Sequence, residues 1–461
     1  MFIGRTQELK QLEDVYRLGK NTAVVLYGRY GVGKTELARL FAKDKPGVFY
    51  VARELSEQEQ AYAFGREMGA SPEDGVPGFY TSLRAAMNRK KREGQKFVVI
   101  IDEFHYLLKT GHEFLSAFIQ MMNEEMPCMF LLLSSSVNWV ENSMVEEMAF
   151  AAKSLSGIMK LREFSFVDVV NRFPNMSVER TIYANAVLGG VPEYLDYWNE
   201  KGTIKENIHR IFLQKNSPLL FAAENFLKKE LRELGAYNAI LATMAAGKYK
   251  LNDIFARTGF SRAKISVYIK NLIELDVVEK VFSFDTTEHA ALVHANVQKG
   301  LYRIKDRYLA FWYRYVFPNL SVILDGRGDE LYEREILPDM TNYMKECFGD
   351  VCSEYLKLMS QYGRLKARYS NWGTWYGKTG SIDIVAGDEK GNILAGFCKF
   401  DNYLMSRKDF NEYQELLELA LIKPTEMYLF SKAGFSEELR KMTAELSTNG
   451  TKIVLVGLDE L

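Results

Sequence analysis

The sequence predicts a multidomain α/β protein that begins with a parallel β-sheet covered by helices on both faces. Three short apolar runs of buried-strand type, residues 22–27, 97–101 and 129–133, alternate with helical patterns, as is typical of a parallel sheet. A glycine-rich turn joins the first run to the helical pattern that follows it. A second α/β pattern starts near Lys305 and continues toward the C-terminus.

Length and composition limit the possible functions. The chain has 461 residues, enough for about three domains of ordinary size. The 59 Lys and Arg nearly balance 60 Asp and Glu, so a nucleic acid or a membrane would have to be attracted by a local patch. Four scattered cysteines without a CxxC pair argue against a disulfide framework or a structural zinc site and fit a reducing compartment. The N-terminus resembles no secretion signal, and no apolar run approaches the roughly 18 residues that span a bilayer; we expect a cytoplasmic protein without a membrane partner.

Changes of pattern divide the chain into four predicted segments. These are a parallel-sheet core over 1–165, a small helical lid over 166–235, a winged helix-turn-helix over 236–304 and a C-terminal α/β domain over 305–461. Three helical patterns followed by two strands define the winged helix, and Ser261 is the expected N-cap of its third helix.

Residues Gly28 to Thr35 follow the pattern G-x-x-x-x-G-K-[ST] of a phosphate-binding loop, the Walker A motif. Gly28, Gly31 and Gly33 allow backbone N–H groups to approach phosphates, and the following helix adds the positive end of its dipole. We expect Lys34 to reach the β- and γ-phosphates and the Thr35 hydroxyl to bind Mg²⁺. With a strand before it and a helix after it, the loop predicts an ATP and Mg²⁺ site.

An acidic pair follows the second apolar run. Asp102 and Glu103 have the Walker B form, in which Asp102 holds Mg²⁺ and Glu103 orients or deprotonates the attacking water. The third run ends in three serines, 134 to 136. One of them, for which we take Ser135, is either a sensor of the γ-phosphate or a cap at the strand end, and the sequence favours neither.

Five ordered motifs, FIGRTQEL, GRYGVGKT, IIDEFHYL, the serine-rich third strand and GGVPEYL, resemble the archaeal-type P-loop ATPases of the AAA+/STAND group over residues 1 to about 235. The resemblance implies a nucleotide-dependent switch with Phe2 to Arg5 near the adenine. It also implies that Gly190 and Pro192 of the lid help to sense the nucleotide, although Gly and Pro also simply interrupt helices.

The chain departs from these families in one respect. They often carry an Arg after the third strand that reaches the γ-phosphate, whereas here only Lys153 and Arg162 are available. P-loop enzymes without such an Arg run about 10³ to 10⁵ times slower, so we expect slow hydrolysis. The sequence therefore does not decide between a ring-forming AAA+ core and a monomeric STAND switch.

The third helix of the expected winged helix would enter the major groove of DNA. Its candidate contacts are Arg262, Lys264, Tyr268 and Lys270. Seven Lys and Arg against five Asp and Glu over residues 237–285 give only a weak basic excess. Contact with another protein is the competing interpretation.

The C-terminal region resembles the domain often fused to these ATPases, which is similar to PD-(D/E)xK nucleases. Asp383 and Lys399 match the Asp and Lys positions of that motif, and Glu354 is a further helical carboxylate. Phe397 stands where the metal-binding Glu is required, and Ser381 where a carboxylate often occurs. We therefore favour a nuclease fold retained without cleavage.

Three functions follow from these motifs. The first is an ATP-dependent switch or motor acting on DNA, the second a regulatory STAND-type ATPase whose C-terminal half binds protein partners, and the third an active metal-dependent nuclease. The sequence favours the first and least favours the third.

Overall fold

The computed structural model describes residues 3–69, 78–284, 300–447 and 451–461, which form two compact units. The first unit contains residues up to Phe164 together with Val191–Glu193 and Phe226–Arg232. The second contains Ser165–Gly190, Tyr194–Asn225 and Glu233–Leu461. Two short parts of the expected lid therefore pack with the first unit, while the remainder of that segment packs with the second.

The first unit is built on a five-stranded sheet in the order β2-β3-β4-β1-β5, with all pairs parallel. Its strands are β1 Thr22–Tyr27, β2 Gly47–Val51, β3 Phe97–Asp102, β4 Cys128–Ser134 and β5 Gly157–Lys160. Every residue of β1, β3 and β4 is buried, which confirms the parallel sheet expected from the three apolar runs. The edge strands β2 and β5 are only partly buried and were not among the expected strands.

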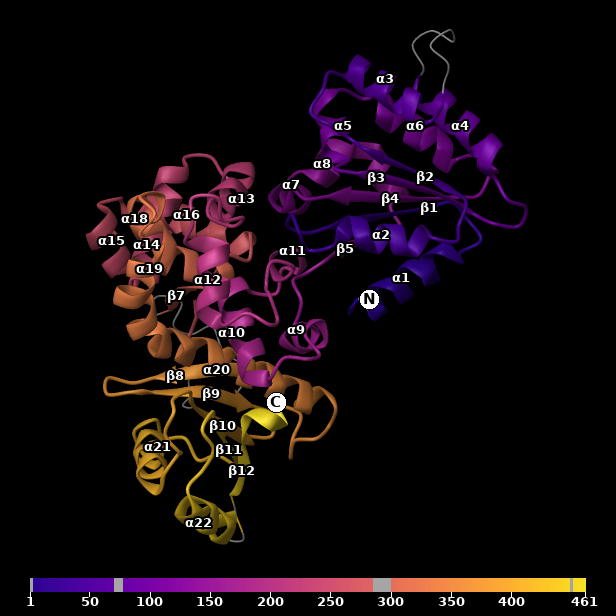
Figure 1. Ribbon diagram of the computed structural model, residues 1–461. Helices are drawn as coiled ribbons and strands as arrows, with labels where there is room; N and C mark the ends of the chain where they lie inside the picture. The colour runs from indigo at the N-terminus through magenta and orange to yellow at the C-terminus, as the bar shows by residue number, and fades with distance from the viewer. Residues whose placement is uncertain (1–2, 70–77, 285–299, 448–450) are drawn as a thin grey trace. The chain divides into compact units, whose positions relative to one another are not determined.

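Helices cover both faces of this sheet, with α1 and α2 on one side and α3 to α6 on the other (Figure 1). Their bounds are α1 Thr6–Tyr16, α2 Lys34–Ala42, α3 Glu57–Glu67, α4 Phe79–Lys90, α5 His105–Thr110, α6 Glu113–Met122, α7 Val137–Asn142, α8 Met144–Met148 and the 3₁₀ turn η2 Ala149–Ser154. Leu37 and Phe41 of α2 pack against Val24 and Leu26 of β1 in one apolar core. Because the strands are parallel, the ends of β1, β3 and β4 lie at one edge of the sheet.

The helical region after Phe164 begins with five short helices: α9 Phe166–Arg172, α10 Val178–Leu188, α11 Pro192–Leu195, α12 Ile204–Phe212 and α13 Ala222–Glu230. Three helices and a two-stranded antiparallel ladder follow: α14 Leu234–Ala245, α15 Leu251–Thr258, α16 Arg262–Glu274, β6 Val278–Val281 and β7 Leu301–Ile304. The Ser261 hydroxyl accepts from the backbone N–H of Lys264, as an N-cap does. The expected β-segment also includes residues 285–299, which lie outside the described residues.

A run of short helical turns leads into α20. These elements are α17 Arg307–Phe311, η4 Trp312–Val316, η5 Phe317–Asn319, α18 Leu320–Leu324, α19 Gly328–Leu331, η6 Tyr332–Ile336 and α20 Leu337–Gln361. Most of their aromatic residues are buried, and the Trp312 indole donates to the Leu220 carbonyl at 2.8 Å. No helix in the described part of the chain has both the length and the apolar character needed to cross a membrane.

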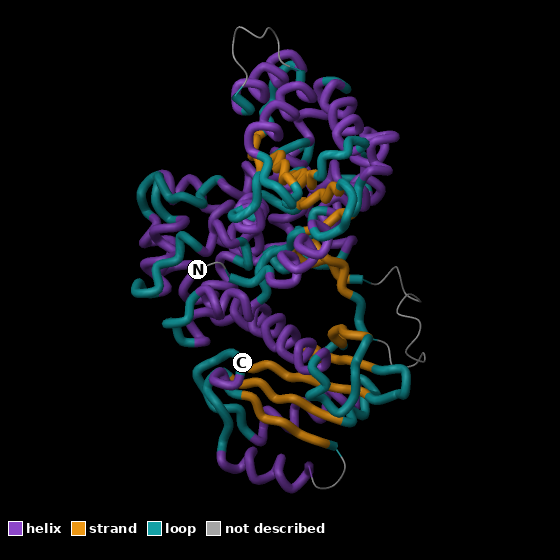
Figure 2. Tube along the Cα trace, turned by 90° about the vertical axis from the view of Figure 1, so that its right-hand side faces the viewer, coloured by secondary structure: helices purple, strands orange, loops and turns teal. Residues whose placement is uncertain are grey.

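The C-terminal sheet is mixed, in the order β12-β11-β10-β9-β8. It comprises β8 Asn371–Tyr376, β9 Ser381–Gly387, β10 Ile393–Lys399, β11 Glu426–Ser431 and β12 Lys452–Val456, with α21 Arg407–Leu419, α22 Glu437–Ser447 and η7 Leu458–Glu460. Strands β8, β9 and β10 are antiparallel, whereas β10, β11 and β12 are parallel. Helix α20 covers one face, and α21 and α22 cover the other (Figures 1 and 2). The hairpin expected around Gly391 is present as β9 and β10.

Candidate nucleotide site

The loop between β1 and α2 has the backbone that phosphate binding requires. A Cβ at Gly28 would lie 2.2 Å from the Leu161 carbonyl oxygen, so any side chain there would collide with backbone. Gly33, the N-cap of α2, has φ 93° in the left-handed region that glycine tolerates best. The two glycines thus set the path of the loop into the helix N-terminus.

Lys34 lies buried at the start of α2. Its ammonium donates to the carbonyl oxygens of Gly28 and Arg29 at 2.7 and 3.0 Å. Burial lowers the pKa of Lys34, whereas the nearby carboxylates of Glu103, Asp102, Glu230 and Glu193 raise it, and the net shift is downward. The lysine is therefore held within the loop where phosphates would bind.

Thr35 and Asp102 meet across the sheet edge. The Thr35 hydroxyl donates to Asp102 Oδ2 at 2.6 Å. Burial raises the pKa of Asp102 above its ordinary value, and the Thr35 hydrogen bond only partly offsets this. A hydroxyl beside a desolvated carboxylate is the hard oxygen donor set that Mg²⁺ prefers, so these residues fit the metal expected from the sequence.

Glu103 is held in a strained conformation directly after β3. Its φ is 53°, in the left-handed region that non-glycine residues rarely adopt. Glu103 Oε2 accepts hydrogen bonds from the backbone N–H and the hydroxyl of Ser135 at 2.9 and 2.8 Å. Of the three serines after β4, Ser135 thus binds the side chain expected to activate water, and Ser134 Oγ lies 3.2 Å from His105 Nδ1.

His105 was not singled out from the sequence. Its Nδ1 lies 3.3 Å from Glu103 Oε2. Burial, assisted by Lys109 and Lys34, lowers the pKa of His105 to about 4, so the ring is neutral at pH 7. The sequence signal that could have identified His105 is its position two residues after Glu103 in the motif IIDEFHYL.

The GGVPEYL segment lies against the phosphate loop. The backbone N–H of Glu193 donates to the Gly31 carbonyl at 3.3 Å. A Cβ on Gly31 would meet Glu193 Oε2 at 2.6 Å and the Val191 side chain at 3.1 Å. Pro192, the first residue of α11, is therefore next to a residue that contacts the loop.

Glu230, at the end of α13, is a second carboxylate that the sequence did not single out. Burial raises the pKa of Glu230 to about 7, against hydrogen bonds from the backbone of Asn138 and Val137. Glu103 adds repulsion and Lys34 attraction. The sequence around Glu230 matches no motif. Glu230 lies near the site because residues 226–232 pack with the first unit.

The N-terminal box also reaches the loop. The Arg5 guanidinium donates to the carbonyl oxygens of Val32 and Arg162 at 3.1 and 2.6 Å. Phe2 lies outside the described residues. Of the two cations considered as substitutes for the missing Arg, Arg162 is linked to Arg5 through its carbonyl, and the Lys153 ammonium lies 4.9 Å from the Phe150 ring centroid.

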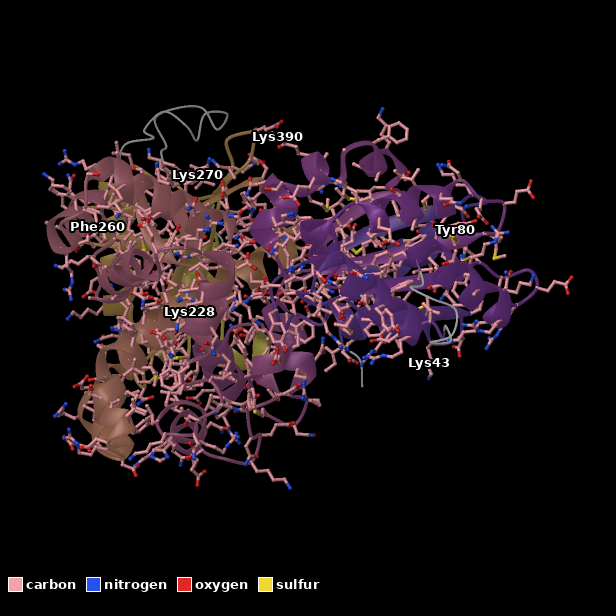
Figure 3. The ribbon with its side chains drawn as sticks, turned by 90° about the horizontal axis from the view of Figure 1, so that it is seen from above. Lys43, Tyr80, Lys228, Phe260, Lys270 and Lys390 are labelled. Atoms are coloured by element: carbon pink, nitrogen blue, oxygen red, sulfur yellow. The ribbon has the colours of Figure 1, made fainter. Side chains whose placement is uncertain are left out.

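In the second unit, three of the four residues expected to face DNA from α16 are exposed, and Lys270 is visible in Figure 3. Tyr268 is an exception: it is buried, and its hydroxyl bonds the Glu233 carboxylate. The expectation that Tyr268 faces solvent was wrong, because its ring packs edge-on against Tyr237 in the helical core. Lys264 pairs with Glu233 at 3.5 Å and Lys270 with Glu274 at 3.6 Å.

The residues expected at a vestigial nuclease site have separate partners. Asp383 Oδ2 accepts from the Cys398 backbone N–H at 2.8 Å, and burial raises the pKa of Asp383 to about 6. Lys399 pairs with Asp409 at 2.8 Å. Glu354 Oε1 instead accepts from the Phe166 backbone N–H at 2.7 Å, at the start of α9.

Phe397 is fully buried and stacks on Tyr413, with ring centroids 4.1 Å apart. Ser381 is the first residue of β9, half-buried beside the hairpin partner strand β8. Among the described residues, no group of three or more His, Cys, Asp or Glu side chains is arranged to hold a metal ion.

Comparisons with known proteins agree with the first unit's geometry. Residues 2–198 match the family described as "ATPase domain predominantly from Archaea". The chain therefore contains an ATPase domain of the P-loop type, with the nucleotide binding that such a domain implies. Residues 312–413 match a second family, described as "Archaea bacterial proteins of unknown function".

One relative and two solved structures extend the comparison. An uncharacterized protein of Methanocaldococcus jannaschii is 26% identical over 394 residues, which is 84% of each chain. A Walker-type ATPase of Pyrococcus abyssi has a TM-score of 0.49 at 18% identity, covering 68% of this chain and 96% of its own. The ORC1 protein of Aeropyrum pernix in complex with DNA has a TM-score of 0.35 at 16% identity, covering 70% of this chain and 95% of its own.

Proposed function

We propose that this protein is an ATP-hydrolysing switch that acts on DNA through its second unit. One observation carries the proposal: Lys34, Asp102 and Glu103 converge at the sheet edge with Glu230. The peptide chain continues from the Glu230 segment directly into the second unit at Glu233. A change of charge at the phosphates would therefore act on Glu230, three residues before the chain enters the second unit.

The chain's own residues account for binding and activation of water. Lys34 exchanges its two carbonyl partners for phosphate oxygens, which are stronger acceptors because they are charged. Thr35 and Asp102 would hold Mg²⁺, which would supply charge neutralisation at the phosphates. Glu103 accepts a proton from the attacking water once Ser135 releases its carboxylate. We expect slow hydrolysis, because neither Lys153 nor Arg162 clearly matches the Arg that stabilises the developing charge in related enzymes.

The DNA part of the proposal rests on α14–α16 with β6 and β7, which we interpret as a winged helix, and on the C-terminal sheet, which we interpret as a nuclease-like fold. Arg262, Lys264 and Lys270 on α16 are the proposed contacts. Phe397 fills the position of a metal ligand with a stacked ring, so we propose binding without cleavage.

A regulatory ATPase whose C-terminal half binds a protein partner is the second candidate. It is favoured by the ion pairs Lys264–Glu233 and Lys270–Glu274, because paired cations leave less charge for phosphates.

The test is phosphate release by the wild type, Lys34→Ala and Glu103→Gln, each with and without duplex DNA. We expect hydrolysis to be lost in both variants and to rise with DNA in the wild type. Arg262→Glu/Lys270→Glu should abolish the stimulation and leave basal hydrolysis intact. Hydrolysis that is indifferent to DNA would refute the DNA part and favour the protein-directed switch.

A further inference from the structure

A cavity of about 680 Å³ lies in the second unit, within the roughly 300 to 1,000 Å³ typical of ligand sites. Three stretches of chain line it: the end of α20, residues 366–372, and the turn between β9 and β10. It has no part in the nucleotide site or in the α16 surface described above.

Four cations line this cavity: Lys357, Lys366, Arg368 and Lys390. All four are exposed, and Lys390 stands out on the turn between β9 and β10 (Figure 3). Among the residues that the structure describes, none of the four forms an ion pair, unlike Lys399 of the same domain, which pairs with Asp409. Unpaired cations converging from three segments are suited to an anion.

The cavity's two carboxylates do not cancel this charge. Asp388 accepts hydrogen bonds from the backbone of Lys390 and Asn392 and from the Asn392 amide, at 2.7 to 2.9 Å. Burial alone would raise the pKa of Asp388, but these bonds bring it below its ordinary value. The Asp388 carboxylate therefore bonds to the turn between β9 and β10. Four cations against Asp388 and Glu389 leave two net positive charges among the lining residues.

Aromatic side chains complete the lining. The Trp372 indole N–H donates to the Tyr369 carbonyl at 3.2 Å, which fixes the ring's orientation while leaving it half-exposed. The Tyr369 ring packs edge-on against Trp372 and is itself held by Glu426 through its hydroxyl at 2.8 Å. A fixed, partly exposed indole beside several cations is the combination that binds a base and its phosphate.

The cavity is distinct from the Asp383 position. Asp383 lies near the start of β9 and Asp388 follows its end, five residues further on, a separation of about 17 Å along a strand. Lys399, at the end of β10, is next to the start of β9 in the antiparallel pair. The cavity and the vestigial nuclease residues thus occupy opposite ends of the hairpin.

We propose that this cavity binds a nucleotide unit, with its phosphate on Lys366, Arg368 and Lys390 and its base against Trp372. The chemistry is shared by a nucleotide within a single strand and by a free nucleotide. The single-strand form rests on the proposed action on DNA, whereas the free-nucleotide form does not.

The experiment measures binding of a fluorescent 5′-phosphorylated oligothymidylate to the full chain. The variants are Lys366→Glu/Arg368→Glu and, separately, Trp372→Leu. The matched control is Lys408→Glu/Lys441→Glu, which reverses the same number of exposed charges on α21 and α22 of the same domain. Thermal unfolding and basal ATP hydrolysis, which the variants should leave unchanged, report on folding.

We expect the double variant to weaken binding more than tenfold and to reduce the slope of log K against log salt by about 1.4, the effect of two lost phosphate contacts on a single strand. Trp372→Leu should weaken binding about fivefold or more without changing that slope. The control should stay within twofold of the wild type. Displacement by micromolar thymidine monophosphate would assign the site to free nucleotides, and displacement only by oligonucleotide to a strand.

The inference is overturned if the wild type binds neither probe, or if the double variant binds like the control. Duplex-stimulated hydrolysis, measured in parallel with the α16 variant, separates the two proposals. Loss of oligonucleotide binding in the cavity variant without any duplex stimulation would leave this site standing and remove the proposed function. Conversely, if duplex DNA stimulates hydrolysis while the cavity variant binds the oligonucleotide as the wild type does, the proposed function stands and the cavity inference is overturned.

Discussion

Ser135 holds the carboxylate of Glu103 with both its backbone N–H and its hydroxyl, at 2.9 and 2.8 Å. Both bonds are made to Oε2, an oxygen that would otherwise be available to accept a proton from water. Ser135, directly after β4, therefore restrains Glu103, directly after β3.

Ser135→Ala removes one of these two bonds and keeps the other. A hydrogen bond to a charged group contributes about 1.5 kcal/mol or more, so we expect basal hydrolysis to rise about tenfold or more with little change in KM for ATP. Steady-state phosphate release measures this. Ser136→Ala is the control, because the Ser136 backbone contacts Ser134 rather than Glu103; an equal rise in that variant would contradict the assignment.

Thr35→Val removes the hydroxyl that bonds Asp102 and keeps the shape of the side chain. We expect hydrolysis to fall on the order of 100-fold, since a metal-bound phosphate contributes several kcal/mol to the transition state. Thr35→Ser retains the hydroxyl and should remain near the wild type. Magnesium titrations of the rate provide the measurement, and similar loss in both variants would point to packing in place of metal binding.

Glu230 should couple nucleotide binding to proton uptake. Burial places its pKa at about 7, and the negative phosphates of ATP raise it further. Between about pH 7 and 8.5 the free protein has lost this proton and the bound protein regains it, so wild-type ATP affinity falls as pH rises through this range. We expect uptake of ~0.5 proton near pH 7.5.

Calorimetric titration with ATP in two buffers of different ionisation enthalpy measures this uptake. Glu230→Gln should abolish it, while Glu36→Gln, an exposed position on α2, should retain it. Equal proton uptake in the wild type and in Glu230→Gln would show that another group titrates.

Asp383 should make the second unit less stable as pH rises. Its folded pKa of about 6 is above the ordinary value of 3.8, so its contribution to stability is fully present below about pH 4 and is lost as pH rises through 6. Asp383→Asn keeps an oxygen for the Cys398 N–H and should raise the free energy of unfolding at pH 8 by roughly 1 to 3 kcal/mol, with little effect at pH 4.

Urea unfolding at the two pH values tests this prediction. Asp388→Asn should show the opposite sign, because hydrogen bonds lower the pKa of Asp388 and its contribution is present above the ordinary pKa and lost in acid. A destabilised Asp383→Asn protein at pH 8 would mean that the charge itself is needed there.

The sequence predicted those parts of the fold and site that depend on local pattern. Strands β1, β3 and β4 are continuous apolar runs, and the phosphate loop has fixed glycines, so the meeting of Thr35 with Asp102 at one sheet edge followed from the parallel topology. The edge strands β2 and β5 were not predicted: β5 is only four residues long and ends in Lys160, and the short apolar run of β2 was not recognised as a strand. Glu230 could not be predicted, since its place depends on where a helix far along the chain returns. Tyr268 was misjudged because the sequence pattern of a helix cannot distinguish a solvent-facing tyrosine from one whose ring packs against Tyr237.

The two returns of the chain to the first unit, Val191–Glu193 and Phe226–Arg232, also bear on synthesis. Domains commonly fold from the N-terminus while the ribosome is still translating. Here the five-stranded sheet has all its strands once Lys160 is made, yet the neighbours of the phosphate loop are not all present until Arg232 has emerged. The nucleotide pocket is therefore finished only after much of the helical region has been made. A truncation after Phe164 would give an ATPase sheet without Glu193 and Glu230, so this catalytic unit is not a detachable module.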